Sequence, residues 1–172
     1  MKNKKIKHKI EEPVVKAVTF DKNQVKVSIL DVPDRPGVAA KIFSALAKEN
    51  INVDMIIQSA ARGKKNDISF TIAHNDLKKT VEVLEQVNKE LNAGGVVYEE
   101  NMAKVSIIGI GMRSHPGVAA KMFETLAENN INIEMISTSE IKISCIIKKE
   151  HIETAVKALH KAFRLDKKPL KI

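Results

Sequence analysis

The spacing of hydrophobic and polar residues changes several times along the chain, and each change predicts a secondary-structure element. Apolar and polar residues alternate with a period of two over residues 26–31, which is typical of a half-buried strand, and residues 53–58 and 67–72 are expected to form two more strands. Apolar residues recur every three or four positions in two other segments, which predicts helices over residues 38–49 and 77–91. Asn50 is suited to ending the first helix, and Asn75 or Asp76 to capping the second. The basic residues between the last two strands predict an exposed hairpin loop over residues 62–66.

The second half of the chain repeats this pattern of elements with nearly the same amino acids. The segment PGVAAKIF at residues 36–43 reappears as PGVAAKMF at residues 116–123, and Asn50-Ile51-Asn52 reappears 80 positions later. A repeat of about 80 residues is the size of one small domain. The second copy predicts strands over 104–110, 133–138 and 142–147, and helices over 117–129 and 151–163.

The order of the elements predicts how the two copies fit together. Each copy reads β-β-α-β-β-α, and a ferredoxin-like βαββαβ sheet needs a further strand after its second helix. The first copy can take that strand from residues 96–99, whereas the second has only a charged, proline-containing end, so we expect Val14–Asp21 to complete its sheet. We therefore predict an α+β fold of two interlocked ferredoxin-like domains. The predicted limits are a basic tail over 1–13, a first domain over 25–100, a second domain over 14–24 and 101–165, and a tail over 166–172.

Composition narrows the class of protein. Aromatic residues make up 3% of the 172 residues, so the two cores must be aliphatic, and the single cysteine, Cys145, is expected to pack as a small hydrophobe. The net charge of +8 comes largely from lysines near the two ends, which are typical of solvated tails. No secretory signal or membrane span is evident, so we expect a cytoplasmic protein without a membrane partner.

Several motifs carry a resemblance to a known family. Asp34-Arg35-Pro36-Gly37 and Ser114-His115-Pro116-Gly117 resemble the helix-entry turns of ACT domains, the sensing modules of amino-acid metabolism. Over residues 12–165 the chain is similar to the C-terminal regulatory part of aspartate kinases, on the segments EPVV at 12–15, FDKN at 20–23, VPDRPG at 32–37, GMRSHPG at 111–117 and ISTSEI at 136–141.

The resemblance implies a regulatory role. It predicts a homodimer without phosphotransferase activity of its own, which binds lysine, threonine or both and controls a kinase catalytic region or subunit. Effector pockets in this family lie between ACT domains of two chains. The implied effector-binding residues are Asp34, Arg35, Pro36, Gly37, Val38, Ala39, Asn52, Val53, Asp54, Gln58, Val118, Ala119, Asn132, Ile133 and Ser139.

The physical chemistry of the Pro-Gly turn is compatible with this role. A glycine before a helix leaves the first backbone N–H groups accessible to a carboxylate, and Asp34 can hold the ammonium of the same amino acid. Attraction by the helix terminus contributes about 0.3–2 kcal/mol, whereas millimolar to micromolar binding needs roughly 4–8 kcal/mol, so further polar partners are required. Two alternatives are a tight turn without a ligand, and Asp34 as a helix N-cap.

The second copy differs at the same turn. Ser114 and His115 replace Asp34 and Arg35, so this copy lacks the carboxylate and its site can bind differently or not at all. His115 is either a pH-sensitive ligand contact or an exposed turn residue. The hydroxyl-rich segment over residues 137–140 is suited to a polar effector or to an ordinary hydrophilic hairpin. Asp54 and the matching Glu134 leave both lysine and threonine open as effectors.

Catalysis and RNA binding are the two rival functions. No phosphate loop, nucleophile elbow or metal-ligand spacing appears, and His151 and His160 are expected to face solvent, so neither catalysis nor a cofactor nor a metal is expected. RNA-recognition domains share the βαββαβ order and a basic charge, but they stack bases on aromatic residues of the central strands. Phe70 alone is a poor platform. RNA binding is therefore the second alternative, and no nucleic-acid partner is expected.

Overall fold

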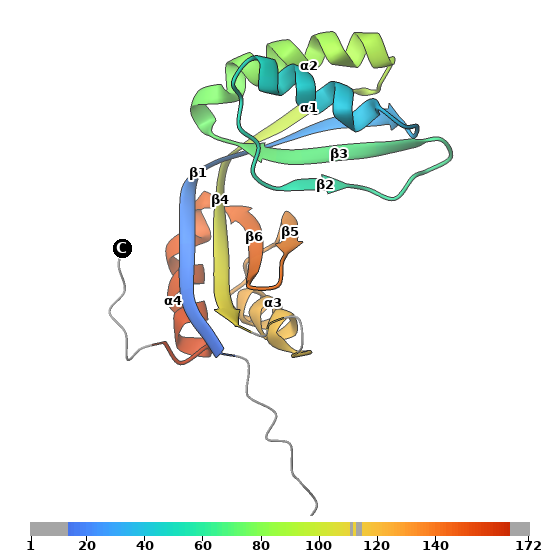
Figure 1. Cartoon of the computed structure of the whole chain (residues 1–172). Coiled ribbons are helices and arrows are strands. Elements are labelled where there is room, and N and C mark those ends of the chain that lie inside the picture. The colour runs from blue at the N-terminus through green and yellow to red at the C-terminus, as the bar shows by residue number, and fades with distance from the viewer. Residues whose placement is uncertain (1–13, 111, 113–114, 166–172) are drawn as a thin grey trace, which may run out of the picture.

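One six-stranded antiparallel sheet runs through the whole protein (Figure 1), in the order β2-β3-β1-β4-β6-β5. The computed structural model describes residues 14–110, 112 and 115–165. Its strands are β1 (Val14–Pro33), β2 (Ile56–Gln58), β3 (Lys65–Ile72), β4 (Gly95–Ile110), β5 (Met135–Thr138) and β6 (Lys142–Lys148). Its α-helices are α1 (Val38–Lys48), α2 (Leu77–Leu91), α3 (Val118–Glu128) and α4 (Ile152–Ala162), with short 3-10 turns at His74–Asp76 and Lys149–His151.

Strands β1 and β4 are shared by the two halves of the protein. The sequence pattern predicted two short strands in the place of each, and this was wrong, because both are continuous. Around Asp21–Lys26 the register between them shifts twice, and Asn101 of β4 has a positive φ of 59°. Bulges of this kind bend a strand without ending it. Each long strand therefore turns from one half-sheet into the other (Figure 1).

The pairing interlocks the two halves. Val14–Asp21 pairs with Lys104–Ile110, which in turn pairs with β6 of the second half. The other end of β1 pairs with β3 of the first half. The predicted fold class, two interlocked ferredoxin-like units, is confirmed. The residue limits of the two domains remain a proposal.

Each half has its own aliphatic core between its helices and its part of the sheet (Figure 1). In the first half, Phe43 of α1 packs edge-on against the fully buried Phe70, with 5.4 Å between the two ring centroids. In the second half, Cys145 is fully buried as predicted, and burial raises the pKa of its thiol to about 12. His160 also lies in this half and is only 7% exposed, so the expectation that it faces solvent was wrong. It belongs to the buried face of α4, whose charged neighbours in sequence lie on the opposite face.

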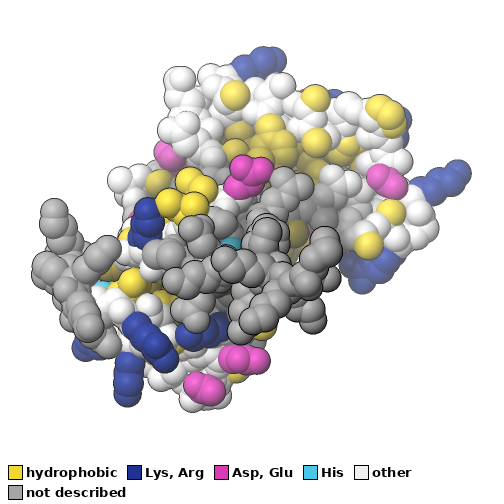
Figure 2. All heavy atoms as spheres, turned by 60° about the horizontal axis from the view of Figure 1, so that its bottom comes forward, with side chains coloured by type: hydrophobic (Ala, Val, Ile, Leu, Met, Phe, Trp, Pro, Cys, Tyr) yellow, Lys and Arg dark blue, Asp and Glu magenta, His cyan; other side chains and the backbone are white. Residues whose placement is uncertain are grey.

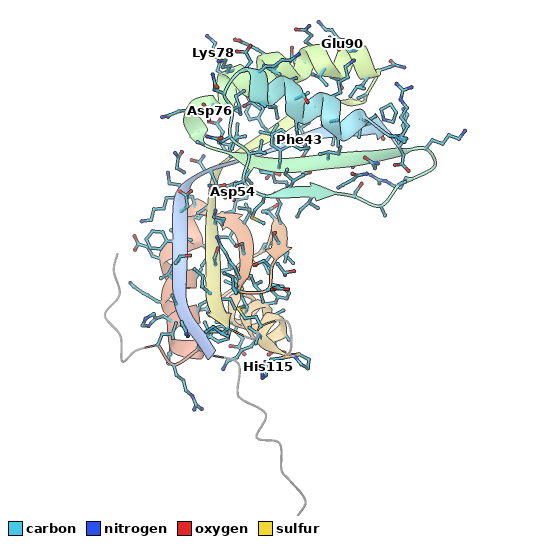
Figure 3. The ribbon with its side chains drawn as sticks, in the orientation of Figure 1. Phe43, Asp54, Asp76, Lys78, Glu90 and His115 are labelled. Atoms are coloured by element: carbon cyan, nitrogen blue, oxygen red, sulfur yellow. The ribbon has the colours of Figure 1, made fainter. Side chains whose placement is uncertain are left out.

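A third, smaller cluster joins the two halves on the side of the sheet that carries no helices. It consists of Met55, Met102, Met135 and Ile146, all buried. Two ion pairs that are related by the internal repeat flank this cluster: Asp54 of the first half pairs with Lys104, and Glu134 of the second half pairs with Lys26. Figure 3 shows Asp54 where the two halves meet. We call these residues the junction.

None of the described helices is long and apolar enough to cross a membrane.

Candidate functional site

The turn before α1 adopts the geometry that its Pro-Gly sequence predicts. Gly37 is the N-cap residue of α1 with φ 91°, a left-handed conformation that favours glycine. No side chain caps the helix, and the Val38 N–H makes only a long 3.5 Å bond to the Arg35 carbonyl. The first N–H groups of a helix have no partner within it. This terminus therefore offers backbone donors to an anion.

Asp34 lies beside this terminus but does not cap it, so the N-cap alternative was wrong. Its backbone N–H donates to the Lys64 carbonyl at 2.8 Å, which fixes it to the β2–β3 hairpin. Its carboxylate accepts a hydrogen bond from the Asn66 side-chain amide at 3.2 Å. The residue is exposed, so the carboxylate is accessible from solvent. An ammonium group can reach it.

Asn66 is a residue that the sequence analysis placed in the hairpin loop. It belongs to β3 and is only 4% exposed. Counting back from Ile72, Phe70 and Ile68 in steps of two would have put it on the inward face of the strand. That alternation was the available signal.

Arg35, Pro36, Val38 and Ala39 lie at this turn, whereas Asn52, Val53 and Asp54 lie away from it. Asp34 bonds to Lys64, whereas the Asp54 N–H bonds to the Thr71 carbonyl, seven residues further along β3, or about 23 Å for an extended strand. Exposed Asn52 and half-buried Val53 immediately precede Asp54. Gln58 is exposed on the edge strand β2, opposite Ile68. Within one chain, Asn52, Val53 and Asp54 do not share a site with Asp34.

Asp54 has a partner that the sequence did not reveal. Its carboxylate pairs with Lys104 at the junction. A carboxylate already paired with a lysine is a weaker ligand for a second cation than a free one, because the two cations compete. Its sequence spacing gave no sign of this contact with a residue 50 positions away.

The second turn has the same backbone and a cavity beside it. Gly117 has φ 105° and, as the N-cap of α3, again leaves the helix without a side-chain cap. A cavity of about 520 Å³ adjoins the turn, and its walls include Met112, His115, Gly117, Ala119, Ser139 and Glu140. That volume is within the range of small-molecule pockets. Half-buried His115 faces this cavity, at the end of the protein where Figure 3 labels it.

The remaining predicted residues of the second copy form two groups, one at the turn before α3 and one beside the junction. Ala119 and Ser139 line the cavity, and Val118 is buried directly behind the turn. Asn132 and Ile133 lie at the opposite end of α3, next to Glu134 of the junction. The polar segment after β5 is both a hairpin and a cavity wall, since the Ser139 N–H bonds to the Lys142 carbonyl at 2.7 Å.

The strand register allows the two turns to be compared residue by residue. The Thr71 carbonyl accepts a hydrogen bond from the Asp54 N–H. The Ile146 carbonyl accepts the equivalent bond from the Glu134 N–H in the second copy. Five positions earlier, Asn66 of the first copy corresponds to Ile141 of the second, and Lys65 corresponds to Glu140. Gly37 and Gly117 therefore share a conformation, whereas the residues around them differ in charge and polarity.

Comparison with known proteins agrees with this duplicated architecture. The model of the ACT domain family matches residues 27–87 and 105–163. The chain is 47% identical over 157 residues to an aspartate kinase of Stutzerimonas stutzeri, covering 91% of this chain but 38% of that protein. It thus spans well under half the length of such relatives.

Two solved structures contain chains that match this one over nearly their whole length. A crystal structure of aspartokinase alpha and beta subunits contains a chain 49% identical to this one, with a TM-score of 0.81, covering 87% of this chain and 99% of that one. The ligand-free regulatory subunit of aspartate kinase from Thermus thermophilus is 41% identical with a TM-score of 0.82, over 87% of this chain and 99% of that one. With two family matches, two uncapped turns and two interlocked halves of one sheet, the chain belongs to the tandem ACT-domain regulatory regions of the aspartokinases.

Proposed function

We propose that this chain senses a free amino acid, lysine or threonine, and controls an aspartokinase catalytic region or subunit in response. The observation that carries the proposal is the repeated turn: Gly37 and Gly117 both adopt a left-handed conformation before a helix without a side-chain cap. A free amino acid carries a carboxylate that such a terminus attracts. The names of the similar structures support a regulatory rather than a catalytic role.

At the first turn, the backbone N–H groups at the start of α1 hold the carboxylate and Asp34 holds the ammonium. These contacts supply part of the roughly 4–8 kcal/mol that millimolar to micromolar binding requires. The remaining partners come from a second chain, so the functional form is a homodimer with the pockets between ACT domains. Asn52, Val53 and Asp54, which lie apart from Asp34 within one chain, then contribute to a pocket from the partner's side, together with Gln58.

The effector follows from the chemistry of its side chain. Lysine needs an acidic group for its second ammonium, whereas threonine needs only a hydrogen-bond partner for its hydroxyl. Thr138, Ser139 and Glu140 line the second cavity, which is compatible with both. Lysine and threonine therefore remain joint candidates.

Regulation acts through a shift between two arrangements of the domains. An effector that binds one arrangement better by about 1–3 kcal/mol changes activity appreciably. The junction is the element whose packing would differ between the arrangements, because its ion pairs join residues of both halves. We place this regulation in the cytoplasm, where amino-acid biosynthesis takes place.

RNA binding is the weaker alternative. Phe70 is fully buried against α1 and cannot stack on a base. On the face that Figure 2 shows, the described lysine and arginine side chains are scattered among acidic ones. A backbone-tracking groove would need them in a stripe.

Isothermal titration calorimetry against lysine, threonine, methionine and isoleucine tests the proposal. Lysine or threonine is expected to bind, and Asp34→Ala is expected to weaken that binding at least fivefold, because a charge-assisted hydrogen bond to the ammonium is lost. Asp76→Ala is the matched control, since Asp76 precedes α2 in the same half without capping it. Equal affinity in wild type and Asp34→Ala would show that the ammonium binds elsewhere.

A further inference from the structure

Asn66 stands out as a polar residue in an apolar position. It occupies the inward face of β3, in line with Ile68, Phe70 and Ile72, whose side chains form the core of the first half. Only 4% of the residue is exposed. A buried amide is unfavourable unless its donors and acceptors find partners. The fold alone therefore gives no reason for an asparagine here.

The amide is only partly satisfied. Its Nδ2 donates to the Asp34 carboxylate at 3.2 Å, while its Oδ1 is buried without a hydrogen-bond partner among the described residues. The contact that Asn66 does make is directed at the carboxylate beside the α1 N-terminus. Among the described residues, Asp34 is otherwise held through its backbone bond to Lys64, so this amide decides where the carboxylate points.

The second copy provides an internal comparison. The position equivalent to Asn66 is occupied by Ile141, and the position equivalent to Asp34 by Ser114. The copy without the carboxylate thus also lacks the amide, although its β6 pairs with β4 and β5 as β3 pairs with β1 and β2. Ile141 is 58% exposed and lies just before β6, so the second copy has neither a buried amide nor a carboxylate at these positions, and the asparagine and the aspartate occur together only in the first copy.

We propose that Asn66 is a positioning residue for the effector, which orients the Asp34 carboxylate toward the ammonium of an amino acid held at the α1 N-terminus. The proposal rests on the function proposed above for this turn. Asn66 acts through Asp34 and not by touching the ligand, because its own free oxygen is inaccessible. Without the amide, the exposed Asp34 side chain would sample several rotamers, and ordering it would reduce the affinity.

If Asn66 has this role, Asn66→Leu is expected to weaken effector binding without lowering the stability of the fold. Affinity for lysine or threonine, whichever binds the wild-type chain, falls about five- to tenfold, because an oriented charged contact is lost. The urea midpoint of unfolding stays the same or rises, because a buried acceptor without a partner is removed. A residue with a purely structural role would lose stability instead.

Two further variants make the test specific. In the Asp34→Ala background, Asn66→Leu is expected to cause no additional loss of affinity, as in a double-mutant cycle for two coupled residues. Thr80→Val is the matched control, because Thr80 is fully buried in α2 and its hydroxyl also lacks a partner among the described residues. It is expected to leave affinity unchanged. Should leucine prevent folding, Asn66→Ala replaces it in the same titrations.

The outcomes separate this inference from the proposed function. If the wild-type chain binds neither lysine nor threonine in calorimetry, the proposed function and this inference both fail. If the wild type binds and Asn66→Leu binds equally well, only the positioning role is overturned. It is also overturned if the variant loses the same factor of affinity in the Asp34→Ala background, or if its urea midpoint falls together with its affinity.

Discussion

At the scale of single residues, Asn50 and Asn130 hold the left-handed conformation that follows α1 and α3. Asn50 was expected to end the first helix in a left-handed conformation, and both it and Asn130 of the second copy have φ 56°. Such preferences are properties of the residue itself. The burial of Asn66 and His160 was missed, because polar side chains were expected to face solvent although the spacing of their apolar neighbours placed both on a buried face.

The glycine of the first turn allows a prediction at this scale. Gly37→Ala is expected to lower the free energy of unfolding by about 1–2 kcal/mol, because φ 91° is a left-handed conformation that disfavours a Cβ atom. The cost is purely conformational, since a Cβ atom at this position would meet no heavy atom of the described residues within 4 Å. Urea denaturation measures it. An unchanged midpoint would mean that residue 37 does not hold this conformation in solution.

At the scale of elements, the helices were predictable and the long strands were not. The helices over 118–128 and 152–162 begin and end within one residue of their predicted limits, since their apolar spacing is local. Strands β1 and β4 were each split into two, because the bulges around Asp21–Lys26 and at Asn101 interrupt the alternation without ending the strand. Periodicity alone cannot distinguish a bulge from a loop.

The shared strand makes the second half depend on the N-terminal segment. Deleting residues 1–22 removes the partner of Lys104–Ile110 and takes Val15 out of the second core. We expect amide hydrogens of β4 and β6 in the second half to lose protection against exchange, while those of β3 keep theirs. Hydrogen exchange followed by NMR measures this. The control is deletion of residues 1–13, which leaves β1 whole; equal protection in both variants would contradict the interlocked sheet.

At the scale of the whole molecule, the junction could not be foreseen. The sequence suggested Asp54 and Glu134 as effector ligands, but each pairs with a lysine from the other half of the chain. Lys26 is further held by Glu99 at 2.9 Å, and Lys148 bonds the other oxygen of Glu99 at 3.0 Å. These contacts join residues 49 to 108 positions apart, which no local pattern specifies.

Lys26 of the junction and its partner Glu99 predict that the stability of the protein depends on pH. Hydrogen bonds from Lys26 and Lys148 lower the pKa of Glu99 below its usual 4.5. Its contribution to stability is therefore present above pH 4.5 and is lost as the pH falls through the lowered value. Burial opposes the charge of Lys26, but the hydrogen bond to Glu99 and the charges of Glu99 and Glu134 outweigh it and raise its pKa above 10.5. That contribution is lost only as the pH rises through this raised value.

Glu99→Gln tests the acid side of this dependence. At pH 7 the variant is expected to be less stable than the wild type by up to about 1 kcal/mol, a small effect because Glu99 is partly exposed. The difference should shrink toward zero as the pH is lowered below the carboxylate's titration. Urea unfolding of both proteins at pH 7 and pH 3 measures it. A difference that stays constant with pH would rule out an ionic contribution from Glu99.

A crystal structure of the chain grown with lysine and threonine tests the central claim most directly. The account predicts density for a free amino acid at the Gly37 turn, with its carboxylate on the N-terminal amides of α1 and its ammonium within hydrogen-bond distance of Asp34. It also predicts that a second chain completes the pocket. Turns that are filled by side chains of the protein itself, at effector concentrations that saturate binding in solution, would contradict it.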